Sequence, residues 1–353
     1  MPDASSRILP PSKGHPTVQQ VLAAWRRLTG GRRVRDPDRR TLVACSGGAD
    51  SSALVLALSA QPESVVVAHI EHDMRPAAES RRCADAARTL AHALNLPFVS
   101  DRIQAKALPG NYEANARVLR YQALARLAGE QGCRAVATAH HAEDQLETML
   151  LKLMRGAGPA GLAGIRVKRR LPGGVTLIRP MLSLIREDAR SLCRDCGWVW
   201  SEDATNADIS CRRAAIRATV LPALLTIDPR TPSKAADAAR LALRTADFLS
   251  QQARLLDAAA RIEASSDYRR DSLRTAPRIV LLTWLRSLEA AAPLRQLEAV
   301  AAAIASRSGE TKQCALGARR LTVHRDRVTL LSFTRIVGPR PRRPGTSAAE
   351  AGG

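Results

Sequence analysis

The chain has 353 residues, with 54 lysines and arginines against 33 aspartates and glutamates, which gives a formal charge of +21. This length predicts two or three domains, and so large a positive charge favours a polyanionic partner, nucleic acid above all. No stretch approaches the ~20 apolar residues that span a bilayer, and residues 1–16 lack the apolar core of a signal peptide. The sequence therefore does not predict a membrane protein, and we expect the protein to be cytoplasmic.

The first half of the chain alternates between two patterns. Short apolar runs have the character of buried parallel strands; they lie at residues 41–44, 65–70, 97–103 and 135–139. Helical patterns separate them, at residues 51–60, 77–94, 112–131 and 143–155. This alternation predicts a doubly wound α/β domain with a mainly parallel sheet over residues 37–226, preceded by a tail and a helix in residues 1–36.

The pattern changes after residue 226. Residues 231–306 are almost wholly helical by pattern, and residues 317–334 have the alternating spacing of a β hairpin. A helical domain with a small C-terminal β hairpin is therefore expected over residues 227–336. Residues 337–353 are rich in Pro, Arg, Ala and Gly and are expected to be disordered.

The arrangement of the cysteines does not indicate a disulfide framework. The chain has seven, scattered and odd in number, which favours reduced thiols. Cys193 and Cys196 form a CxxC pair inside a predicted helix, with no second pair nearby. Packing of the helix is therefore preferred to a redox or iron–sulfur site as the interpretation of this pair.

The most informative motif joins the first predicted strand to the following helix, with the sequence CSGGADSS at residues 45–52. Gly47 and Gly48 permit positive φ and a close approach of the backbone, so that successive N–H groups form an anion nest at the helix start. No lysine follows the second glycine, so this is not the Walker pattern, and it is not GxGxxG. The form SGGxDS resembles the PP-loop of the N-type ATP pyrophosphatases, which cleave ATP between the α and β phosphates.

Four further motifs follow in order. HIEHDMR at residues 69–75 comes just after the second strand, where ligands bind in a doubly wound sheet. EANARVLRY at residues 113–121 places its polar side chains on one side of a helix. TAHHAEDQLET at residues 138–148 spans a strand end and a helix start, and residues 179–222 run from RPML to a final RRAAIRATVLP.

Together with RGAGPAGLAG at residues 155–164, these motifs resemble one family, the tRNA(Ile)-lysidine synthetases, over residues 40–225. Glu143 stands where that family has the first Asp of its HHxDDQ motif. The resemblance implies an adenine nucleotide α-hydrolase-like PP-loop domain that uses ATP and Mg²⁺. It implies adenylation of the wobble cytidine in the CAU anticodon of isoleucine tRNA, followed by ligation of free lysine to C2 and release of AMP and pyrophosphate.

The resemblance also implies roles for residues at matching positions. ATP is expected to bind Ser46, Gly47, Gly48, Ala49, Asp50, Ser51, Ser52, His72 and Arg75, with Asp50 also as the Mg²⁺ ligand. The catalytic residues are expected to be Asp50, Arg120, His140, Asp144, Glu147, Arg212 and Arg217. Asp144 and Glu147 would meet the amines of lysine, and an arginine its carboxylate or a phosphate. Asp144 is the first choice for the general base and His140 the second.

The basic hairpin is expected to contact tRNA phosphates through Arg319, Arg320, Arg325 and Arg327. Two alternatives stay open. One is a PP-loop thiolase acting on tRNA cytidine, which bound iron and sulfide would reveal. The other is a non-catalytic basic RNA-binding protein, which would release no AMP in response to lysine. The oligomeric state is not decided, and a homodimer stays open.

Overall fold

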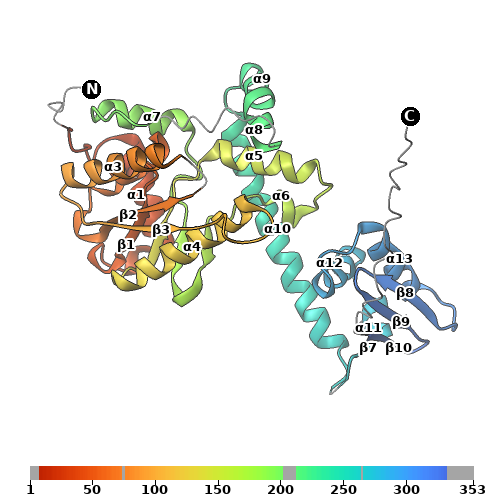
Figure 1. Cartoon of the computed structure of the whole chain (residues 1–353). Coiled ribbons are helices and arrows are strands. Elements are labelled where there is room, and N and C mark those ends of the chain that lie inside the picture. The colour runs from red at the N-terminus through yellow and green to blue at the C-terminus, as the bar shows by residue number, and fades with distance from the viewer. Residues whose placement is uncertain (1–7, 74–75, 202–211, 264, 332–353) are drawn as a thin grey trace, which may run out of the picture. The chain divides into compact units, whose positions relative to one another are not determined.

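The computed structural model describes residues 8–73, 76–201, 212–263 and 265–331, and it divides into two compact units, Met1–Ala246 and Asp247–Gly353 (Figure 1). The division falls within the long helix α10, Thr231–Ala260. The boundary expected between residues 226 and 227, which separates the ATP-binding domain from the helical and β domain, stays a prediction. Within the described ranges, no helix combines the length and the apolar character that crossing a membrane requires.

The first unit is built on a six-stranded sheet in the order β3-β2-β1-β4-β6-β5. Five strands are parallel: β1 Thr41–Ala44, β2 Val65–His72, β3 Phe98–Ile103, β4 Ala135–Ala137 and β6 Thr176–Ile178. The sixth, β5 Lys168–Arg170, is antiparallel to β6. The expected doubly wound, mainly parallel sheet is confirmed, although the strand predicted over residues 135–139 ends at Ala137 and β5 was not expected.

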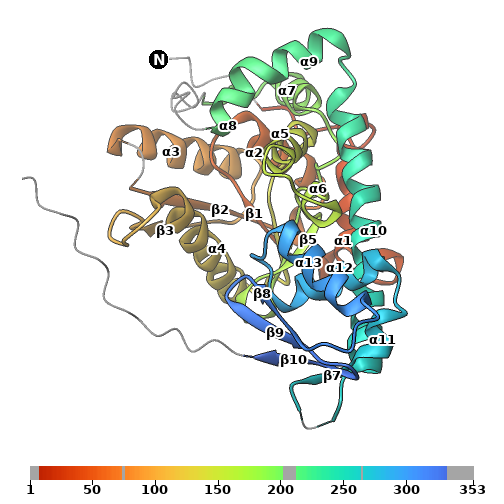
Figure 2. The same cartoon turned by 90° about the vertical axis from the view of Figure 1, so that its right-hand side faces the viewer.

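Helices cover both faces of the sheet because its central strands are apolar on both sides (Figure 2). Val65 and Val67 face one core, whereas Val66 and Ala68 face the other, as the two-residue period of a strand requires. The first core is completed by α1 Pro16–Leu28, α2 Ala49–Leu58, α3 Ala77–Ala93 and α7 Arg186–Asp195. The second is covered by α4 Tyr112–Glu130.

The rest of the first unit lies C-terminal to β4. It consists of α5 Ala142–Leu153, α6 Pro159–Leu162, α8 Arg212–Ala215, a π-helix Ile216–Val220, α9 Leu221–Ile227 and the start of α10. A small apolar core joins α5 to the later helices; its residues are Leu146, Ile216, Leu221 and Ala235. This core holds α8 and the π-helix against α5, and π-helical turns are frequent at functional sites.

The second unit has a four-stranded antiparallel sheet in the order β7-β10-β9-β8, which packs with α11, α12, α13 and the C-terminal part of α10. Its elements are β7 Asp267–Arg269, α11 Arg270–Arg274, α12 Arg278–Leu288, α13 Leu294–Ala305, β8 Lys312–Leu316, β9 Arg319–Val323 and β10 Arg327–Leu331. The expected hairpin corresponds to β9 and β10. The region expected to be almost wholly helical is interrupted by β7, because Tyr268 is buried there edge-on against Trp284, with ring centroids 5.0 Å apart.

Candidate active site

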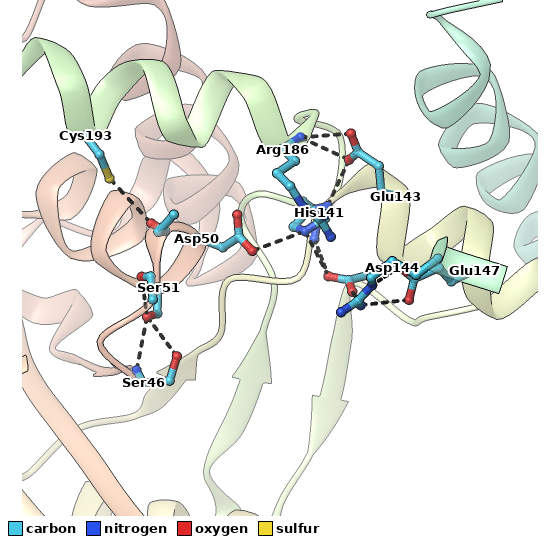
Figure 3. Close-up of polar contacts among 12 residues, drawn as sticks. Ser46, Asp50, Ser51, His141, Glu143, Asp144, Glu147, Arg186 and Cys193 are labelled. Atoms are coloured by element: carbon cyan, nitrogen blue, oxygen red, sulfur yellow. Dashed lines mark hydrogen bonds and ion pairs between the residues drawn. The ribbon is translucent and has the colours of Figure 1, made fainter. Parts of the chain in front are cut away.

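The loop between β1 and α2 has the conformation that phosphate binding needs. Gly47 has a φ of 83°, and a Cβ at this position would lie 2.8 Å from the carbonyl oxygen of Cys83, so only glycine fits. The Ser51 hydroxyl accepts a hydrogen bond from the Ser46 N–H at 3.1 Å and donates one to the Gly48 carbonyl at 3.0 Å (Figure 3). These bonds fix the loop, and the first-turn amides of α2 have no acceptor within the helix.

Two cavities meet at this loop. The first, of about 510 Å³, lies over the ends of β1, β2 and β4 and beside α4. The second, of about 450 Å³, lies between the loop and α7. Their shared wall is made by Ser46, Asp50, Ser51, Asp144 and Arg217. A molecule that reaches from one cavity to the other therefore passes these five side chains.

A buried histidine links the loop to α5. The Nε2 atom of His141 lies 3.3 Å from Asp50 Oδ2, and its Nδ1 atom lies 2.9 Å from Glu143 Oε2 (Figure 3). Burial lowers the pKa of His141, but the bonds to Asp50 and Glu143 outweigh it and raise the pKa to about 10. The imidazolium therefore holds one oxygen of Asp50. The other, Oδ1, is buried and has no hydrogen-bond partner among the described residues.

Glu147 holds two arginines on one wall of the first cavity. Its side chain is fully buried; the Nε atoms of Arg213 and Arg217 each lie 2.8 Å from one of its oxygens. Both guanidinium groups also lie near Asp144 Oδ1, at 3.6 and 3.8 Å. Glu147 is not among the residues that line either cavity. Its expected role as partner of a lysine amine stays a prediction, and these contacts give it a second role as an anchor.

Helix α4 supplies the cationic side of the first cavity. Arg117 and Arg120 lie over the Tyr121 ring, with guanidinium carbons 5.3 and 5.7 Å from its centroid. Burial raises the pKa of Tyr121, yet the guanidinium charges outweigh it and lower the pKa overall. Burial, aided by these cations, lowers the pKa of His140 to about 3, so its imidazole is neutral at pH 7. The His140 Nδ1 atom lies 3.0 Å from the Thr138 hydroxyl.

Most residues predicted from the sequence lie at these cavities. Among the predicted residues, the first cavity is lined by Ser46, Asp50, Ser51, His72, Arg120, His140, Asp144 and Arg217. Gly48 and Ala49 line the second cavity. Gly47, Ser52 and Arg212 are not in either lining; Ser52 is fully buried and Arg212 is exposed on α8. Arg75 lies outside the described residues. Arg319, Arg320, Arg325 and Arg327 are exposed in the second unit.

The predicted site residues did not include His141, Arg213, Arg186 and Arg190, nor Arg117, which lines the first cavity from α4. His141 and Arg213 stand directly beside His140 and Arg212, so the motifs contained them but did not show which neighbour turns inward. Arg186 and Arg190 line the second cavity from α7. The sequence signal for Arg186 and Arg190 was their spacing of four residues in the predicted helix that also carries Cys193 and Cys196, which places them on one face.

The side chains present are compatible with Mg²⁺ bound together with a polyphosphate. Mg²⁺ commonly takes one or two carboxylates, with phosphates and water filling its other positions. Asp50 Oδ1 is a carboxylate oxygen without a hydrogen-bond partner in the described part of the chain. The same part contains no group of three His, Cys, Asp or Glu side chains placed to hold a metal alone. A Mg²⁺ ion would therefore depend on its nucleotide, with Asp50 as its protein ligand.

Residues 18–224 match the family model of the PP-loop domain. Among solved structures, the U34-tRNA thiolase NcsA from Methanococcus maripaludis with its 4Fe–4S cluster has a TM-score of 0.50 to this chain, with 16% identity. The match covers 64% of this chain and 78% of that one. At this identity the likeness shows a shared fold alone.

Three curated relatives are named tRNA(Ile)-lysidine synthase. The Salinispora arenicola protein is 40% identical over 60% of this chain and 65% of its own length, so the chain spans slightly less than two thirds of that relative. The Salinispora tropica protein is 40% identical over 66% of this chain and 71% of its own. The Methylobacterium protein is 37% identical over 77% of this chain and 75% of its own length. The chain therefore belongs to the tRNA(Ile)-lysidine synthase family of PP-loop proteins.

Proposed function

We propose that this chain joins free lysine to C2 of the wobble cytidine in the CAU anticodon of isoleucine tRNA. In the first step the cytidine O2 attacks the α-phosphorus of ATP, the bond to the bridging α–β oxygen breaks, and pyrophosphate leaves. In the second step an uncharged amine of lysine attacks C2, its proton passes to a base, and AMP leaves with the electrons of the C2–O bond. The product is lysidine.

The observation that carries this proposal is the pair of cavities that meet at the PP-loop. The first cavity is lined by four arginines, Arg117, Arg120, Arg213 and Arg217. Arg217, which lines both cavities, and the amides at the start of α2 favour the negative charge that grows on pyrophosphate as it leaves. Mg²⁺, when bound, would neutralise part of the same charge. Both features suit adenylation of an oxygen at the wall between the cavities.

The proton of the attacking amine has two candidate acceptors on the first cavity. Although burial raises the pKa of Asp144, the charge of the His141 imidazolium, the hydrogen bond from the His141 N–H and the charge of Arg213 outweigh it and lower the pKa, so the carboxylate is ionised. His140 is neutral, for the reasons given above. Both groups are therefore in the proton-accepting form at neutral pH, and each lines the cavity.

Release of AMP tests this proposal. We expect the full chain to release AMP and pyrophosphate from ATP only with isoleucine tRNA, and AMP in step with incorporated lysine. Reactions without lysine, without tRNA and with methionine tRNA serve as controls. AMP release that does not depend on lysine would contradict the proposal.

The thiolase alternative is addressed by the cysteines of α7. Burial raises the pKa of Cys193 to about 12 and that of Cys196 to about 11, so both are thiols at neutral pH, and the Cys193 thiol donates a hydrogen bond to the Ala49 carbonyl. We expect the double variant Cys193→Ala, Cys196→Ala to keep lysine incorporation within a few-fold of the wild type, and neither protein to contain iron after anaerobic purification. Loss of activity together with loss of bound iron would support a thiolase instead.

The second unit is proposed to bind the tRNA backbone. Arg319 and Arg320 are exposed at the start of β9. We expect Arg319→Glu with Arg320→Glu to weaken tRNA binding and to make the slope of log affinity against log salt shallower, by about 1 for each phosphate that the variant no longer binds. The control reverses two other exposed arginines of this unit, Arg274 and Arg295. Equal affinity and slope in both double variants would place the tRNA-binding surface elsewhere.

A further inference from the structure

The two cavities at the PP-loop differ in what they offer a nucleotide. The first is lined by residues at the end of β2, namely Ala68, His69 and Ile70, and by α4. The second is lined by Gly48 and Ala49, which belong to the loop and to the start of α2. Gly48 and Ala49, where the loop passes into α2, therefore lie at the second cavity, on the side of α7, and not at the first.

Helix α7 presents an arginine pair to this second cavity. Arg186 and Arg190 lie one turn apart, and both line the cavity together with Arg217. The Nε atom of Arg190 is buried and has no hydrogen-bond partner within the described residues. A buried hydrogen-bond donor of a charged group without an acceptor lowers the stability of the fold, unless a ligand supplies the acceptor.

The carboxylates of the second cavity do not balance these charges. Asp50 Oδ2 is taken by the His141 imidazolium at 3.3 Å. Asp144 Oδ1 lies near the guanidinium groups of Arg213 and Arg217. Among the described residues, both acidic side chains that line this cavity therefore already face other cations, which leaves the guanidinium groups of Arg186 and Arg190 available to an anion.

The helix that carries the arginines is held on two sides. Glu143 accepts the Arg186 N–H at 3.1 and 3.0 Å through its two oxygens, and it also meets His141 (Figure 3). Further along α7, the Cys193 thiol donates to the Ala49 carbonyl at 3.5 Å, at the start of α2. These bonds tie α7 to the loop, so the arginines are positioned before any ligand arrives.

We propose that Arg186 and Arg190 form a pyrophosphate-binding wall. On this assignment, which rests on the proposed function, ATP spans the two cavities with its nucleoside in the first and its β and γ phosphates in the second. Pyrophosphate is then held on the α7 side after cleavage, outside the first cavity.

Direct binding of inorganic pyrophosphate and of AMP tests this assignment. Calorimetry on the full chain without tRNA or lysine would compare the wild type with Arg190→Ala, Arg186→Ala and Arg190→Lys. We expect Arg190→Ala to weaken pyrophosphate binding by about 10-fold or more, as removal of a charged hydrogen bond implies, and to leave AMP binding within about 2-fold. Arg190→Lys should recover part of the affinity, since it restores the charge.

The matched control is Arg194→Ala. Arg194 lies one turn beyond Arg190 on the same helix, it pairs with Glu187 at 2.5 Å, and it does not line either cavity. Its replacement should leave the affinity for pyrophosphate unchanged.

Four outcomes separate this assignment from the proposed function. Unchanged pyrophosphate affinity in both alanine variants, or equal losses of affinity for pyrophosphate and AMP, would overturn the assignment. A wild-type chain that binds no pyrophosphate would overturn it as well. A chain that binds both ligands as expected and yet forms no lysidine would leave the wall in place and refute the proposed function.

Discussion

Replacement of Asp50 by asparagine is expected to lower the rate of pyrophosphate release by about 100-fold or more while the fold stays intact. Asp50 lies on the wall shared by both cavities, and its Oδ1 atom is the carboxylate oxygen proposed to serve Mg²⁺. Asparagine keeps the size of the side chain but removes its charge, and the effect of removing one electrostatic group at a reacting centre is commonly of this size. The rate would be measured as tRNA-dependent pyrophosphate release.

Two comparisons make this result interpretable. Asp85→Asn changes an exposed aspartate on α3 and should leave the rate unchanged. Urea unfolding of Asp50→Asn should resemble that of the wild type, because the Asp50 side chain is 34% exposed. Pyrophosphate release within a few-fold of the wild-type rate would remove Asp50 from the reaction.

Glu147→Ala is expected to destabilise the first unit and to abolish lysine incorporation. The carboxylate is fully buried and pairs with the Nε atoms of Arg213 and Arg217. Its removal leaves two partly buried cations without this carboxylate, which costs about 3 kcal/mol, and it releases both guanidinium groups from the cavity wall. The free energy of unfolding in urea and the rate of lysine incorporation would both be measured.

Glu187→Ala is the matched control, because it also breaks a glutamate–arginine pair but at the surface, where Glu187 and Arg194 are 61% and 52% exposed. Exposed pairs contribute little to stability. If Glu147→Ala unfolds like the wild type and loses affinity for lysine alone, the anchor role is wrong and the role expected from the sequence is right.

The sequence predicted the elements whose residues carry their own signal. The apolar runs of β1 and β2 and the glycines of the PP-loop are local features, and the structure confirms the strands and the turn. The strand β5 consists of Lys168, Arg169 and Arg170, all exposed, and no local pattern marks it. It forms because its backbone pairs with β6, which is a property of the fold.

The sequence indicated where the site lies in the fold, but it did not show which charged side chains form ion pairs there. Asp144 and Glu147 lie one turn apart on α5, as their spacing predicted. The partners of Glu147 lie 66 and 70 residues further along the chain. Only the packing of α8 and the π-helix on α5 brings them together, so the motif alone assigned Glu147 to a substrate.

The central claim is that this chain makes lysidine, and analysis of the tRNA nucleosides tests it most directly. Isoleucine tRNA with the CAU anticodon would be incubated with the full chain, ATP, Mg²⁺ and isotopically labelled lysine, and then digested to nucleosides. We expect one labelled nucleoside per tRNA, with the mass of cytidine plus lysine less one water, and no such product from methionine tRNA. Unmodified cytidine at the wobble position, with ATP and lysine unconsumed, would contradict the account.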